Sequence, residues 1–122
     1  MGSTPTLSAK MKTVFIAHPI SGDIVGNMKK VLGICEQIHS KDIVPVAPYL
    51  VSLQYLNDEV MEDRVLGIAA NLECFHRKYI DELWLFGDKI SSGMVQEVKL
   101  AKSLGIPIIP KTPETEKDLR EL

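Results

Sequence analysis

The amino-acid sequence predicts an α/β fold, a three-layer sandwich in which helices cover both faces of a parallel sheet. Short apolar runs alternate with longer segments whose apolar residues recur at helical spacing. This alternation supplies the crossovers of helical length that parallel strands require. The second apolar run contains Pro45, which lacks an N–H and is tolerated only in an edge strand. With right-handed crossovers, these observations favour four to five strands in the order 2-1-3-4, a flavodoxin or Rossmann-like arrangement.

The first half of the chain contains two predicted strands and two predicted helices. Residues 13–17 are an apolar run that Pro and Gly end, which indicates the first strand. Residues 24–41 have helical spacing, and Ser21 or Asp23 can cap that helix. Residues 42–49 are the predicted edge strand. Residues 49–57 show no clean period, which suits a loop or a short helix, and residues 58–75 return to helical spacing.

The second half repeats the alternation. Residues 81–87 are the third predicted strand, residues 92–104 the next helix and residues 105–110 the fourth strand. Beyond them, Thr112 can cap a short terminal helix that has Pro113 at its first position.

The bulk composition is that of one globular domain. The chain has 122 residues, with 45% hydrophobic and 25% charged residues, and we expect a flexible leader at 1–12 and a single domain at 13–122. A net charge of -2 argues against a broad surface for a nucleic-acid polymer or an acidic membrane. No apolar stretch approaches the roughly 20 residues that cross a bilayer. Cys35 and Cys74 lack metal-ligand spacing, so we expect reduced thiols, a cytoplasmic location, and neither a metal nor a cofactor.

Two loops are predicted to meet where the strand order reverses, between the first and third strands. Ligands of open parallel sheets bind at this point, beside the carboxyl ends of the strands. The loops are "AHPISGD" and "GDKISSG". In the second, Gly87 and Gly93 allow close backbone approach, while Ser91, Ser92 and the free N–H groups of the helix can bind an anion. Ordinary turn and cap roles are the alternative.

Glu97 falls on the apolar side of the helix predicted at 92–104. It lies three residues after Met94, four before Ala101 and seven before Leu104, so its carboxylate shares the arc that should be buried. Burial would raise its pKa, whereas the helix N-terminus would lower it. Such a carboxylate is a candidate functional group. The alternative is a glutamate at the rim of the arc that reaches water or pairs with a lysine.

Three stretches carry a resemblance to a known family: "VFIAHPISG", "DELWLFG" and "SSGMVQEVKLAKSLGIPII". Over residues 13–109 the chain resembles the nucleoside 2-deoxyribosyltransferase family, including its nucleotide N-glycosidase branch and related phage and bacterial proteins. The most specific part of the resemblance is a small loop residue followed by Gly. A Glu lies four residues after this Gly, and the pattern "A...G.P" follows before a strand.

The resemblance implies roles for several residues. Glu97 would attack the anomeric carbon, as in a retaining glycosidase, and a second base or water would then resolve the glycosyl ester. Ser91 matches a serine that contacts the 5′-phosphate, and Ile20 to Gly22 match a loop around sugar and phosphate. The candidate substrate-binding residues are His18, Ile20, Ser21, Gly22, Gly87, Ser91, Ser92, Gly93 and Met94.

The chain departs from the family pattern at the acid that assists the leaving base. A family aspartate falls here near Asn71 or Glu73, and Asn71 cannot act as an acid. Asp88 lies at the carboxyl end of the third strand and is a better substitute than Asp81, which lies at the other end. The candidate catalytic residues are therefore Glu97, Asp88 and Asn71.

Three further side chains have two interpretations each. His18 stands where the family usually has a smaller residue, and it can contact base or phosphate or be a hydrogen-bonded loop histidine. Tyr49 and Tyr55 can stack on a base, or serve packing or a subunit contact.

The predicted function is cleavage or transfer at the N-glycosidic bond of a nucleoside or nucleotide. A non-catalytic module that binds a nucleotide or nucleotide-derived signal is the alternative, and a purely structural subunit is a third hypothesis. We also expect a homo-oligomer, because the family commonly completes its pocket with a neighbouring subunit and residues 58–75 are apolar on more than one side.

Overall fold

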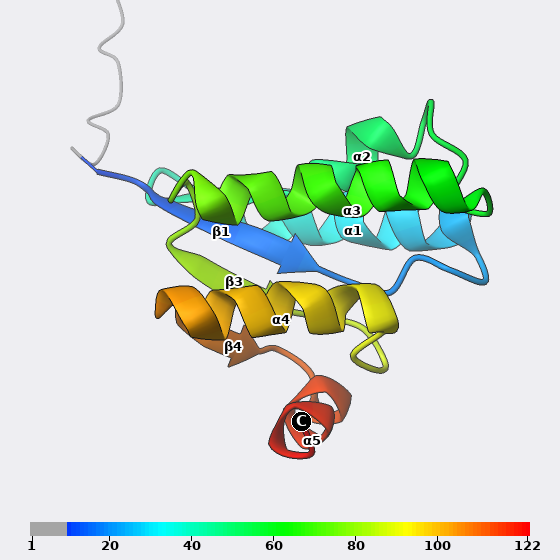
Figure 1. Ribbon diagram of the computed structural model, residues 1–122. Coiled ribbons are helices and arrows are strands. Elements are labelled where there is room, and N and C mark those ends of the chain that lie inside the picture. The colour runs from blue at the N-terminus through cyan, green and yellow to red at the C-terminus, as the bar shows by residue number, and fades with distance from the viewer. Residues whose placement is uncertain (1–9) are drawn as a thin grey trace, which may run out of the picture.

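The computed structural model describes residues 10–122 (Figure 1). Its elements are β1 (Lys12–Ala17), α1 (Ile24–Ile38), β2 (Ile43–Val46), α2 (Tyr49–Ser52), α3 (Met61–His76), β3 (Glu82–Leu85), α4 (Ser92–Leu104), β4 (Ile108–Pro110) and α5 (Pro113–Arg120). Most of the predicted leader lies outside the described residues, and Lys12 already belongs to β1. Within the described part of the chain, no helix is long and apolar enough to cross a membrane.

The sheet has four parallel strands in the order β2-β1-β3-β4, which confirms the predicted topology. Pro45 faces Val14 across the outer strand pair, so β2 is the edge strand that its proline requires. The strand order reverses between β1 and β3, where Phe15 pairs with Leu83.

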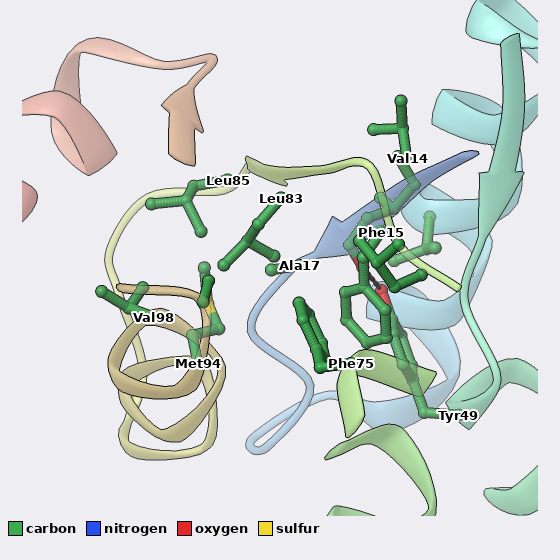
Figure 2. Packing of buried hydrophobic residues seen from close by; sticks show 13 residues of the cluster. Val14, Phe15, Ala17, Tyr49, Phe75, Leu83, Leu85, Met94 and Val98 are labelled. Atoms are coloured by element: carbon green, nitrogen blue, oxygen red, sulfur yellow. Dashed lines mark hydrogen bonds between the residues drawn. The ribbon is translucent and has the colours of Figure 1, made fainter. Parts of the chain in front are cut away.

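The core lies against the sheet, and Figure 2 shows one part of it. The fully buried ring of Phe15 packs against Phe75 of α3 and Tyr49 of α2, with centroid distances of 5.0 and 6.2 Å. Met94 and Val98 of α4 lie toward Leu83 and Leu85 of β3 in the same view. Helices α3 and α4 therefore cover one face side by side (Figure 1), and a right-handed crossover places α1 on the other.

Two helix boundaries differ from the prediction because local polar contacts intervene. Helix α1 ends at Ile38, since the hydroxyl oxygen of Ser40 accepts from the N–H groups of Asp42 and Ile43 at 3.1 Å each and forms a turn into β2. Helix α3 begins at Met61 rather than at residue 58, since the Asn57 side chain accepts from the N–H of Glu59 at 3.0 Å in a turn.

Helix α5 braces the loop between β3 and α4. Thr112 caps α5 as predicted, and its hydroxyl donates to the carbonyl oxygen of Gly87 at 2.8 Å. The fully buried Thr115 donates to the carbonyl of Leu85 at 3.2 Å. The Asp118 carboxylate accepts from the N–H of Ile90 at 2.9 Å. The terminal helix thus fixes the loop that leads into α4.

Candidate functional site

A cavity of about 480 Å³ lies beside the carboxyl ends of β1 and β3, at the predicted position. Its wall comes from the loops after these strands and from α2, α3 and α4. Nine of the predicted residues line it: His18, Ile20, Ser21, Asn71, Ser91, Ser92, Gly93, Met94 and Glu97. The sheet topology therefore brings together residues that lie up to 79 positions apart in the chain (Glu97 minus His18).

Glu97 is buried in this wall with 6% of its surface exposed. Met94, Val98 and Ala101 are buried on the same side of α4, as the helical spacing predicts. Over residues 10–122 the carboxyl group has neither a hydrogen-bond partner nor an ion pair. Removal from water therefore raises the pKa of Glu97 from its ordinary value of 4.5 to about 8. The rim position with a lysine partner is wrong for this glutamate.

Tyr49 lines the same cavity, but its hydroxyl donates to the carbonyl of Ile16. Burial first, and then the nearby Glu97 charge, raise the pKa of Tyr49 well above 10. Tyr49 therefore serves packing, which was one of its two interpretations. Tyr55 is 72% exposed and is not part of the cavity wall.

The loop after β3 supplies polar groups at the start of α4. The Ser91 hydroxyl accepts from the N–H of Met94 at 3.4 Å and caps the helix. Arg64 of α3 reaches across, and its Nη2 lies 3.5 Å from Oγ of Ser92. The first N–H groups of a helix have no intrahelical acceptor. This corner of the cavity thus combines helix N–H groups, hydroxyls and a guanidinium, and Lys89 adds a second cation to the wall.

His18 directly follows β1 as a buried residue with 9% exposure. Its ring nitrogen Nδ1 lies 2.6 Å from the carbonyl oxygen of Pro19. A Cβ placed on Gly87 would lie 2.5 Å from Cδ of Pro19, and Gly87 also has φ +96°. Gly87 therefore permits the two loops to approach each other, and it does not line the cavity.

Three predicted site residues lie outside this cavity. Asp88 is exposed and is not part of the cavity wall, so its assignment in place of the family aspartate stays a prediction. Gly87 has the supporting role described above. Gly22 lines a neighbouring hollow of about 310 Å³, which shares Ser21, Asp58 and Arg64 with the main cavity.

The two positions near the family aspartate differ from each other. Asn71 faces the cavity, and its buried Oδ1 has no hydrogen-bond partner in the described part of the chain. Glu73 is exposed and pairs with Arg77 at 2.9 Å. Asp81 accepts from the N–H of Thr13 at 2.8 Å, at the amino-terminal end of the sheet, and is structural.

Arg64, Asp58 and Lys89 are cavity residues that sequence reasoning missed. Arg64 had a signal, because it precedes Ile68 by four residues and Asn71 by seven and so shares their helix face. Asp58 accepts from the Ser21 hydroxyl at 3.4 Å, and this residue and Lys89 lie in connecting segments where no periodicity applies. Among the residues that the structure describes, no cluster of His, Cys, Asp or Glu could hold a metal ion.

The comparisons with known proteins identify the family of this chain. Residues 12–111 match the family described as Domain of unknown function (DUF7768). The chain belongs to this family. No curated protein matches the DUF7768 chain.

One solved structure is similar, "Crystal structure of conserved protein from Enterococcus faecalis V583". The match has 19% identity and a TM-score of 0.55, and it covers 90% of this chain and 73% of the other. At this identity the likeness supports the fold alone. The resemblance to nucleoside 2-deoxyribosyltransferases remains a prediction.

Proposed function

We propose that this DUF7768 protein cleaves or transfers at the N-glycosidic bond of a nucleoside or nucleotide, with Glu97 as the nucleophile. One observation carries the proposal: a carboxyl group without a partner is buried in the wall of a cavity at the strand-order reversal. A buried ionisable group that serves only packing is rare, because its charged form is costly to desolvate. A role as the nucleophile would explain why this carboxyl group is buried.

The chemistry follows the retaining pattern. The Glu97 carboxylate attacks the anomeric carbon and forms a glycosyl ester while the base leaves, and then water or a second base attacks that ester. The transition state has oxocarbenium character. Its positive charge favours the ionised form of a neighbouring carboxyl group, which opposes the effect of burial on the pKa of Glu97.

The polar corner at the start of α4 favours a nucleotide over a nucleoside. Ser92 with its neighbour Arg64, the helix N–H groups and Lys89 are suited to a phosphate group. In this arrangement a 5′-phosphate would bind at the start of α4, and the sugar would lie toward Glu97, one turn further along the helix.

The test is base release from a panel of nucleosides and nucleotides, measured with the wild type and Glu97→Gln. The amide keeps the size of the side chain but cannot form the glycosyl ester. We expect base release by the wild type and a loss of at least about 10³-fold in the variant, as for other removed nucleophiles. Lys99→Gln on the exposed side of the same helix is the matched control and should keep full turnover. Equal turnover by Glu97→Gln would refute the proposal.

A non-catalytic nucleotide-binding module is the second candidate. It is favoured by the same buried carboxyl group, whose burial raises the pKa to about 8 and keeps it neutral at pH 7, and by the position of Asp88 outside the cavity. This candidate predicts thermal stabilisation by a nucleotide without release of base. Stabilisation with release supports the enzyme.

We further propose that the protein forms a homo-oligomer through α3. On this helix Met61, Val65 and Leu66 are 71%, 55% and 58% exposed. Contiguous exposed apolar side chains are typical of protein interfaces.

A cytoplasmic location also remains a proposal, and the free thiols of Cys35 and Cys74 are its support.

A further inference from the structure

The His18 ring is held in one orientation at the edge of the cavity. A carbonyl oxygen can only accept a hydrogen bond, so the contact of 2.6 Å between Nδ1 and the Pro19 oxygen requires a proton on Nδ1. The other edge of the ring faces the second loop, where Cδ2 lies 3.6 Å from the position that a Cβ on Gly87 would occupy. The contact with Pro19 thus orients the ring within its own loop, and Cδ2 lies on the side of Gly87 in the loop before α4.

This orientation leaves the second ring nitrogen unprotonated in the neutral side chain. An imidazole with its proton on Nδ1 has a lone pair on Nε2. No hydrogen-bond partner of Nε2 exists within residues 10–122. His18 is part of the cavity wall together with Glu97, so a ligand in that cavity can reach the imidazole ring.

The other polar groups of the wall are less suited to move a proton. Asn71 does not titrate, and the Tyr49 hydroxyl is bound to Ile16. The Asp58 carboxylate already accepts from the Ser21 hydroxyl at 3.4 Å, and this residue also lines the neighbouring hollow. His18 lies instead at the end of β1, next to the strand that ends in the loop before α4.

We infer that His18 is a second catalytic residue, which protonates the leaving nucleobase through Nε2. This inference rests on the function proposed above. The Glu97 carboxyl group first gives its proton to Nε2, directly or through a water molecule. The resulting carboxylate forms a bond to C1′ while the C1′–N bond breaks, and its electron pair goes to the base nitrogen, which takes the proton from Nε2.

The second half of the reaction reverses the proton path. Water attacks C1′ of the glycosyl ester and gives a proton to Nε2, the bond between C1′ and the Glu97 oxygen breaks, and the imidazolium returns the proton to the carboxylate. The sum is a glycoside plus water giving a sugar and a free base, with both side chains restored. In a transfer reaction the N–H of the accepting base replaces water.

The test compares two leaving groups in the full chain carrying His18→Asn. The asparagine amide can still donate to the Pro19 oxygen, as Nδ1 does, but it lacks a group equivalent to Nε2. The probes are guanosine and 2′-deoxyguanosine 5′-monophosphates and their 7-methyl derivatives. A 7-methylated guanine is already cationic and leaves without protonation. We expect the rate on the ordinary nucleotides to fall by about 10²–10⁴-fold, the usual contribution of general acid–base catalysis, and the rate on the methylated ones to change by less than about tenfold.

The outcomes separate this inference from the function on which it rests. An equal loss on both kinds of leaving group would overturn the acid role and leave His18 as a loop-positioning residue. Long-range ¹H–¹⁵N NMR spectra give a readout without turnover, and a proton on Nε2 instead of Nδ1 would overturn the inference even in an active enzyme. If the spectra show Nδ1–H but wild-type protein releases no base from any member of the full panel of nucleosides and nucleotides, the proposed function has failed and the catalytic role of His18 fails with it.

Discussion

The Glu97 carboxyl group has been removed from water without receiving a partner in return. In most proteins a buried carboxylate is compensated by a cation or by hydrogen-bond donors. Here Met94, Val98 and Ala101 surround it on the same side of α4, and the cavity lies in front of it. Burial therefore favours the protonated form of this side chain.

This burial makes the stability of the protein depend on pH. Because burial raises the pKa of Glu97 to about 8 from 4.5, the folded state holds a proton between these values that the unfolded state has released. The contribution of this group to the free energy of unfolding is thus fully present below pH 4.5 and is lost as the pH rises to 8. At 1.36 kcal/mol per pKa unit the loss is roughly 3–6 kcal/mol.

The measurement is urea denaturation of wild type and Glu97→Gln at several values from pH 4.5 to 9. As the pH rises across this window, the free energy of unfolding of the wild type should fall relative to that of Glu97→Gln, because glutamine does not titrate. Since the other titrating groups are common to both proteins, they cancel in the difference between the two free energies. A difference that stays constant with pH would contradict the buried, partnerless state of this carboxyl group.

At the scale of elements, hydrogen bonds from α5 hold the loop that forms one wall of the cavity. Helix α5 contacts this loop through a hydrogen bond of 2.9 Å from the Ile90 N–H to Asp118. Ile90 directly precedes Ser91, the residue that caps α4. We expect Asp118→Ala to lower the free energy of unfolding by about 1–3 kcal/mol, because the Ile90 N–H then loses its acceptor. Amide hydrogen exchange at Ile90 should become faster, while Glu121→Ala, at an exposed position beside α5, should change neither quantity. Unchanged exchange at Ile90 in Asp118→Ala would show that the loop holds its shape without α5.

Sequence patterns predicted best the elements whose ends carry a capping residue or a terminating glycine. Helix α4 matches its predicted bounds because Ser91 caps its start and Gly105, with φ 71°, ends it. The short helix α2 remained ambiguous, since it depends on the packing of Tyr49 against Phe15 across the fold. Periodicity likewise identified Glu97 and would have identified Arg64. Asp58 and Lys89 enter the cavity from irregular segments, and only the three-dimensional structure brings them there.

At the scale of the whole molecule, the exposed side of α3 is the surface through which we expect copies of the chain to associate. Val65 and Leu66 lie on this side, whereas Arg64 and Asn71 of the same helix face the cavity. Association through α3 would therefore bring a second chain next to the site. Burial of these apolar side chains would stabilise the interface by about 25 cal/mol per Å² of apolar surface removed from water.

A charge placed on this surface should prevent association, because the interface would have to desolvate it. We expect Val65→Glu to have the mass of a single chain in size-exclusion chromatography with light scattering at micromolar concentration, where the wild type has a multiple of that mass. Leu32→Glu is the matched control, since Leu32 of α1 is 56% exposed and Val65 is 55% exposed. If Leu32→Glu dissociates the assembly and Val65→Glu does not, the interface lies on α1 instead. A wild type of single-chain mass would mean that the cavity is complete within one chain, and the proposed reaction would then have to use only groups of the wall described above.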